Sequence, residues 1–163
     1  NGEDNNKQEI RALFGVKQDI FYPYIGFGIR RLENDSEGMR STTGHYGYNR
    51  VSKYFYLPIG LGIDLISNDK INIKTKLEYD HLIIGRQTSD LTYLGGSKIK
   101  NDQRDGNGYR FSLQFSVPVD KSISVFIEPF YEYWDVDDSD VYLQYYEPKN
   151  TTEEFGMKVG IGF

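Results

Sequence analysis

The chain has 163 residues and no cysteine, and its 24 acidic and 19 basic side chains give a formal net charge of −5. This length fits one domain, and the lack of cysteine excludes disulfide scaffolds and thiolate metal sites. The negative balance and the scattered Lys and Arg residues argue against a nucleic-acid partner, which needs a clustered basic surface. The longest charge-free run, 54–63, falls short of the roughly 20 residues of a spanning helix, which excludes a helical membrane protein.

Aromatic residues make up 15% of the chain, with 14 Tyr, and 17 residues are Gly. This balance is unusual for a soluble domain and is typical of a chain whose apolar surface alternates with a polar one. The composition therefore leaves a membrane β-barrel open. Because the chain starts at Asn1 without a Met or a signal peptide, we expect a processed or trimmed N-terminus.

Apolar and polar residues alternate with period 2 in segment after segment, whereas helical spacing with caps at both ends is not found. In 54–65, for example, Phe55, Leu57 and Ile59 share one face and Tyr54 and Tyr56 the other. We therefore predict an all-β protein, an antiparallel up-and-down transmembrane β-barrel. The predicted strands cover about 8–17, 21–30, 54–65, 71–86, 110–119, 123–136 and 153–163.

Short and long connections alternate along the chain. The short ones are 18–20, 67–70 and 120–122, and the long ones are 33–52, 87–108 and 137–152. In a meander this places all tight turns on one rim and all long polar loops on the other, as in outer-membrane barrels with periplasmic turns and extracellular loops. No domain boundary is visible, so we predict one barrel domain over 1–163.

The predicted strand number is odd, whereas a closed barrel of a bacterial single chain has an even number of strands. The parity of the loops places 1–7 on the long-loop rim. We therefore expect the first strand of an eight-stranded barrel to precede residue 1. A short local strand in 140–147 is the alternative.

Alternation alone does not decide whether the apolar face lines a soluble calyx or faces lipid. Glycines on the polar face would make room for Tyr and Arg side chains inside a narrow barrel, which favours lipid outside. Aromatic residues near both edges of the apolar band are typical of membrane girdles. The glycines are Gly26, Gly28, Gly60, Gly62, Gly156, Gly160 and Gly162, and the girdle residues are Phe21, Phe55, Tyr109, Tyr133, Phe155 and Phe163.

The C-terminal segment FGMKVGIGF, residues 155–163, resembles the closing strand of bacterial outer-membrane proteins, which typically ends in an aromatic residue after alternating apolar residues. In that family the strand is the signal for the barrel-assembly machinery, and the resemblance would carry this role to Val159, Ile161 and Phe163. The whole chain resembles the small outer membrane protein A-like and porin-like eight-stranded barrels. The resemblance implies a Gram-negative outer membrane, with lipid and lipopolysaccharide as partners.

Pleat parity places six acidic and six basic side chains on the polar face, inside the barrel. Because unpaired charges are costly at low dielectric, matched numbers predict ion pairs that plug the lumen. An eight-stranded barrel is also just wide enough for its side chains to fill. A gated ion path is the alternative. The predicted lumen charges are Glu9, Arg11, Arg30, Asp64, Lys74, Lys76, Glu78, Asp80, Arg110, Glu128, Glu132 and Lys158.

The acidic stretch 135–140 offers Asp135, Asp137, Asp138 and Asp140 as hard oxygen ligands for Ca²⁺. It lacks the glycine and the closing glutamate of a calcium loop. We interpret it as a solvated loop edge, with bound Ca²⁺ or divalent-bridged lipopolysaccharide as the alternative, and predict no metal or cofactor.

His45 and His81 are the only neutral-pH general bases in the sequence. Asp80 and His81 do not form a dyad, because neighbours on a strand face opposite sides. His81 at the lipid surface, as in lipid A hydrolases, is the alternative, but no outward serine with a distinctive motif accompanies it. We predict no catalytic residue and no enzymatic activity.

These patterns together predict an outer-membrane barrel with a plugged lumen and three long extracellular loops. Structural anchoring and surface contact are the predicted functions. The alternatives are a porin-like channel for small solutes or ions and a soluble lipid-binding calyx. The residues predicted for surface contact are His45, Tyr46, Tyr48, Tyr93, Tyr142, Tyr145 and Tyr146.

Overall fold

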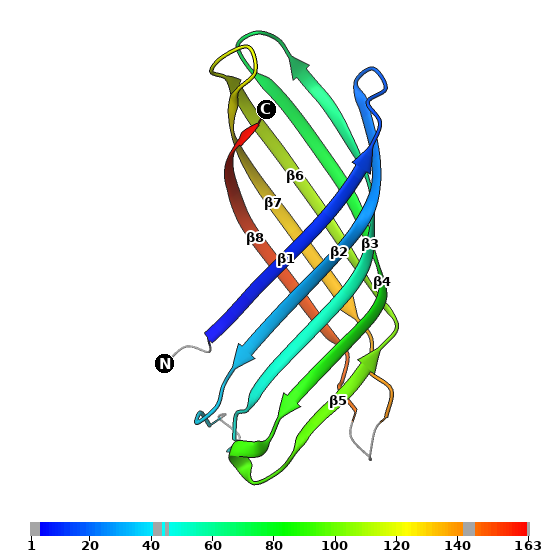
Figure 1. The fold of residues 1–163 in the computed structure, drawn as a ribbon, viewed down its shortest axis with the longest axis vertical. Coiled ribbons are helices and arrows are strands. Elements are labelled where there is room, and N and C mark those ends of the chain that lie inside the picture. Colours follow the sequence, from blue (N-terminus) through cyan, green and yellow to red (C-terminus); the bar gives the residue numbers. More distant parts are fainter. Residues whose placement is uncertain (1–3, 41–43, 45, 142–145, 163) are drawn as a thin grey trace.

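The computed structural model describes residues 4–40, 44, 46–141 and 146–162, and this part of the chain is dominated by β-strands (Figure 1). A short 3₁₀ helix, η1 (Thr92–Leu94), lies in one connection. The strands are β1 (Asp4–Gly15), β2 (Phe21–Asp35), β3 (Asn49–Ser67), β4 (Asn72–Asp90), β5 (Lys98–Gln103), β6 (Gly106–Pro118), β7 (Ser124–Val136) and β8 (Asn150–Gly162).

The strands form one antiparallel sheet in the order β1-β2-β3-β4-β6-β7-β8, and β5 lies off this path, paired only with β4. The sheet curls into a half-barrel whose short turns lie at one rim and whose long connections lie at the other (Figure 1). The predicted all-β, up-and-down architecture is therefore confirmed. The two edge strands, β1 and β8, run in the same direction because five antiparallel strands separate them along the path.

The segment 87–108, predicted as one long loop, is largely a hairpin, and this part of the prediction was wrong. β4 continues to Asp90, and β5 pairs with its last six residues, from Gly85↔Gln103 to Asp90↔Lys98. Two exposed ion pairs bridge this hairpin in addition to its backbone pairing. Arg86 Nε lies 2.7 Å from Asp102 Oδ1, and Lys98 Nζ lies 2.7 Å from Asp90 Oδ2.

The predicted alternative strand in 140–147 is not found among the described residues of this segment. Residues 140, 141, 146 and 147 form no strand, and 142–145 lie outside the described residues. Among the described residues, no helix is long and apolar enough to cross a membrane.

A β-bulge interrupts the pairing of β3 with β4 at the level of Ile83. Phe55 pairs with Ile84 and Tyr56 with Leu82, so Ile83 is an extra residue in β4. Ile83 and Ile84 are therefore both exposed, at 45% and 43%. Beyond the bulge the parity is reversed, which keeps Gly85 and Gln87 on the same face as Asp80 and Leu82.

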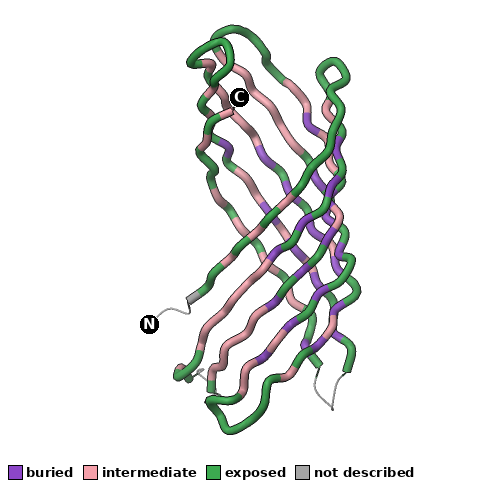
Figure 2. The backbone as a smooth tube through the Cα atoms, in the orientation of Figure 1, coloured by how far each residue is buried: buried purple, intermediate pink, exposed green. Residues whose placement is uncertain are grey.

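The polarity of the two faces is the reverse of that in a soluble barrel. The concave face carries the charged residues. The ion pair between Arg110 on β6 and Glu9 on β1, which crosses the interior, is one example. The convex face carries apolar residues that remain exposed, such as Ile10 at 77% and Phe155 at 78%. Buried and exposed residues alternate along the middle strands, as Figure 2 shows. The apolar residues of the described core are Tyr24, Tyr54, Tyr56, Leu82, Trp134 and Val136.

Two glycines on the concave face provide the space for buried tyrosines. A Cβ on Gly28 would lie 2.1 Å from the ring of Tyr56, and a Cβ on Gly60 would lie 2.1 Å from the ring of Tyr24. Both distances are far below van der Waals contact, so no other residue fits unless the tyrosine moves. The prediction that these glycines make room for tyrosines is confirmed at these two positions.

Candidate functional site: the charged interior

The centre of the interior is organised by Arg110 on β6. Its Nη2 lies 2.9 Å from Glu9 Oε1 on β1 and 3.0 Å from Glu132 Oε2 on the neighbouring β7. Its Nε lies 3.7 Å from Glu78 Oε1 on β4. One guanidinium thereby joins carboxylates from three strands, a role suited to its planar set of five donors.

Glu132 collects further donors around the same point and is only 2% exposed. Arg30 on β2 donates to its Oε1, and Lys7 Nζ on β1 lies 2.9 Å from its Oε2. The indole of Trp134 donates to Oε1 at 2.8 Å. Lys7 also lies 2.5 Å from Glu154 Oε2, which links the two edge strands through their side chains.

A second group of ion pairs lines the half of the interior nearer the short turns, around a hollow of about 460 Å³. Asp64 lies 2.8 Å from Lys17 and 3.4 Å from Lys74. Glu128 lies 2.9 Å from Lys76 and 3.6 Å from Lys158. Arg11 pairs with Glu78 of the central group.

The structure places all twelve predicted lumen charges on the concave face. Eleven of them form ion pairs within 4 Å, and Asp80, fully buried, forms none with the described residues. Sequence reasoning missed Lys7, Lys17 and Glu154. Lys7 lay just outside a predicted strand and Lys17 at the end of one, whereas Glu154 lies on the polar parity of β8 and could have been found there.

Aromatic rings close the interior beside these charges; tyrosines were expected there, whereas Trp134 is a residue that sequence reasoning missed. Trp134 packs edge-on against Tyr56, with ring centroids 5.0 Å apart, and Arg30 lies 5.2 Å from the Trp134 ring centroid. The Tyr56 hydroxyl donates to Glu9 Oε1 at 2.6 Å. These rings are 0–2% exposed, so they belong to the core and not to a girdle.

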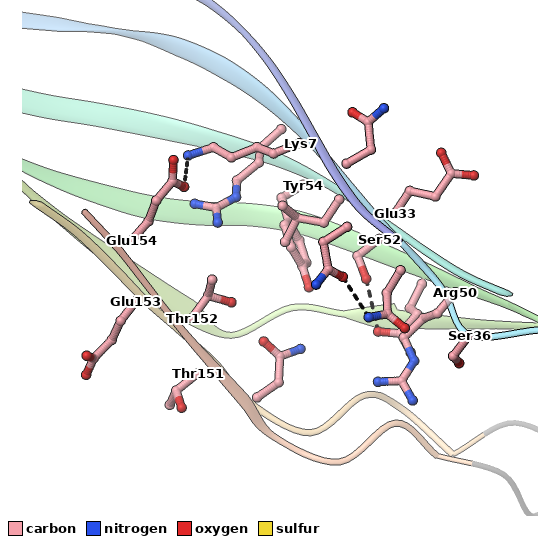
Figure 3. Close-up of a pocket in the computed structure, with 17 residues that line it drawn as sticks. Lys7, Glu33, Ser36, Arg50, Ser52, Tyr54, Thr151, Thr152, Glu153 and Glu154 are labelled. Atoms are coloured by element: carbon pink, nitrogen blue, oxygen red, sulfur yellow. Dashed lines mark hydrogen bonds and ion pairs between the residues drawn. The ribbon is translucent and has the colours of Figure 1, made fainter. Parts of the chain in front are cut away.

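Above this core, a polar hollow of about 590 Å³ opens at the long-loop rim (Figure 3). Ser52 and Tyr54 on β3 line it from one side, and Thr152 and Glu154 on β8 line it from the other. Ser52 donates to Gln87 Oε1 at 3.1 Å. Arg30 and Lys7, which belong to the central network, also line the hollow.

Basic side chains of the chain itself form ion pairs with carboxylates of the acidic stretch 135–140. Lys149 Nζ lies 2.9 Å from Asp135 Oδ2 and 3.1 Å from Asp137 Oδ1, and hydrogen bonds to these carboxylates raise the pKa of Lys149. The Lys149 amide donates to Asp138, and Arg104 Nε lies 3.2 Å from Asp140 Oδ2. Within the described residues, no group of three His, Asp or Glu could hold a metal ion.

The remaining predicted residues that the structure describes lie on the outer face or at the long-loop rim. His81 is exposed and Asp80 is buried, so the two face opposite sides as predicted. Phe163, His45, Tyr142 and Tyr145 lie outside the described residues. The outward-facing residues are Phe21, Phe55, Tyr109, Tyr133, Phe155, Val159 and Ile161. At the loop rim, Tyr46, Tyr93 and Tyr146 are exposed and Tyr48 is partly exposed.

In comparisons with known proteins, no family model matches the chain, and no curated protein matches it.

Proposed function

We propose that this chain forms the membrane-embedded wall of a bacterial outer-membrane β-barrel. The observation that carries the proposal is the inverted polarity, with charges inside and exposed apolar side chains outside. Soluble monomers rarely expose contiguous apolar patches larger than a few hundred Å². Here the outward residues of the wall strands are mostly apolar over their middle parts, with Thr75 and His81 on β4 as polar exceptions.

The length of the apolar band supports lipid as its solvent. Outward apolar residues extend over 21–29 on β2, over 55–65 on β3 and over 109–117 on β6. These runs of 9 to 11 residues match the roughly 9–11 residues that a tilted transmembrane strand needs. A soluble calyx would need the same residues on its concave face, where the charged network lies.

The interior supports a structural role and not the passage of solutes. Arg110, Glu132 and Arg30 meet in the centre of the half-barrel with the Trp134 ring beside them, and these side chains are 0–7% exposed. Charges in such contact are costly to separate in a low dielectric. We therefore assign the chain a sealed interior, no enzymatic activity and a role in anchoring.

Surface contact is assigned to the long-loop rim. The β4–β5 hairpin lies at this rim, and Tyr46, Tyr93 and Tyr146 are exposed there at 50%, 59% and 57%. Exposed tyrosines offer large, rigid contact areas at low entropic cost. Replacing 36–48 and 137–149 by short turns should weaken surface binding while leaving the wall and Tyr93 in place. Unchanged binding of both variants to cells or envelope material would contradict this assignment.

Fractionation of the native protein, followed by gel electrophoresis with and without boiling, tests the membrane assignment. We expect carbonate-resistant membrane association, because the convex face of the half-barrel exposes apolar side chains, and a mobility shift on heating, because an SDS-resistant sheet binds less detergent than the unfolded chain. A soluble protein with no shift would overturn the proposal. A planar bilayer recording tests the sealed interior, for which discrete conductance steps would be the contrary result.

A further inference from the structure

At the side of the long loops, the apolar band of each wall strand ends at an outward polar residue; β4 also carries the outward His81 below this end, where it pairs with Asn107. Charge is distributed unevenly among these seven positions. Three neighbouring strands carry cations, and two neighbouring strands on the other side carry acids. In sheet order the residues are Gln8, Arg31, Lys53, Arg86, Asn107, Asp135 and Glu153.

The three cations lie side by side in the register of the sheet. Arg31 pairs with Lys53, and Lys53 pairs with Arg86, so like charges stand directly opposite each other on β2, β3 and β4. Such pairs are destabilising unless a counter-charge is present. This arrangement calls for an anion above the strands.

Among the described residues, acids pair with the two outer cations but not with the middle one. Arg31 Nη1 lies 2.8 Å from Glu33 Oε2, and Arg86 Nε lies 2.7 Å from Asp102 Oδ1. Lys53, exposed between them, forms no ion pair within 4 Å with the described residues. Lys53 is thus the cation with its charge available to a ligand.

An apolar groove lies directly below this row of cations. Ile29, Phe55 and Ile84 are register partners of one another. Each lies two residues nearer the middle of the apolar band than the cation on its own strand. They line a groove of about 230 Å³ together with Lys53 and Arg86. A ligand that fits both parts has an anionic head and an apolar chain.

We infer that Arg31, Lys53 and Arg86 bind the phosphate of an anionic membrane lipid whose acyl chain lies in the groove. This inference rests on the proposed membrane function. Lipid phosphate matches the charge of the row, and the bilayer places the headgroup at the edge of the apolar band. The acidic side of the rim, with Asp135 and Glu153, is expected to hold no such lipid.

The test compares lipid retention by the purified full chain and its K53Q variant. Detergent-solubilised protein is mixed with phosphatidylglycerol or with phosphatidylcholine, and bound lipid is counted by native mass spectrometry. One cation near a membrane surface corresponds to about a fivefold change in affinity. We therefore expect K53Q to bind phosphatidylglycerol about fivefold more weakly, with phosphatidylcholine unchanged, and K53R to restore binding.

The matched control is K121Q, which removes a lysine in a short turn at the opposite rim. It should retain phosphatidylglycerol as the unchanged chain does. Equal retention by K53Q and the unchanged chain would overturn the inference. Displacement of the lipid by inorganic phosphate alone would assign the site to a free anion and overturn the lipid source.

The heat-dependent gel shift separates the two possible failures. If the unchanged chain shows no shift and stays soluble, the proposed function fails. If the chain and K53Q both show the shift but bind phosphatidylglycerol equally, only the lipid site fails.

Discussion

Replacing Glu132 by Gln removes the charge on which the central network converges. Glu132 is 2% exposed and faces Arg30, Arg110 and Lys7, so the variant leaves three cations around a neutral amide. Breaking a buried ion pair by removing one partner costs about 3–5 kcal/mol. An exposed pair is worth only about 0–1 kcal/mol. We therefore expect the free energy of unfolding to fall by about 3–5 kcal/mol if the interior is dry.

The assay is urea unfolding of the refolded protein in detergent micelles, followed by circular dichroism. The matched control is Glu33→Gln, which removes the partner of Arg31 in a partly exposed ion pair and should cost less than about 1 kcal/mol. In the double variant R110Q/E132Q both charges are absent, so its loss should be smaller than the sum of the two single losses. A loss below about 1 kcal/mol for Glu132→Gln would refute the dry network.

Three further predictions concern the wall and the loop rim. Gly28→Ala should destabilise the protein by about 1–3 kcal/mol or more, because the new Cβ overlaps the buried ring of Tyr56; an unchanged urea midpoint would contradict this. Ile59→Lys should cost about 2–4 kcal/mol for a protein refolded into vesicles, whereas a change within about 0.5 kcal/mol would indicate a water-facing site. Hydrogen bonds from Lys98 and Thr92 lower the pKa of Asp90 from 3.8 to about 2. The stabilisation of the β4–β5 hairpin by Asp90 is therefore complete above about pH 4 and lost as the pH falls through about 2. Hydrogen exchange in 91–97, corrected for its intrinsic pH dependence, should accelerate over that range in the unchanged chain and show no such step in Asp90→Asn.

Period-2 alternation predicts the seven wall strands because one face of each is apolar over its middle part. It does not predict β5, whose residues Lys98–Gln103 include only one apolar side chain and are held by ion pairs with β4. Nor does it predict the extra residue Ile83, because a bulge between two adjacent isoleucines leaves both on the apolar side. Where the stabilising contacts are polar and cross-strand, the pattern of a single segment carries no signal.

The sequence predicts which charged side chains face the interior, but not which of them pair with each other. Strand parity assigns Glu9 and Arg110 to the same face, yet they are 101 residues apart and meet only because the sheet curls. Trp134 lies on the polar parity of β7, and its burial depends on the Tyr56 ring from a distant strand. Curvature and side-chain packing, which decide these contacts, are properties of the assembled sheet.

The most direct test of the membrane account uses single cysteines, because the natural chain has none. Fluorophores attached at positions 111 and 113, which face outward on β6, are compared with fluorophores at 114 and 116, which face the interior. The account predicts that quenchers carried on lipid chains reduce the signal at 111 and 113 and leave 114 and 116 unaffected. Quenching at 111 and 113 only by water-soluble agents would contradict it.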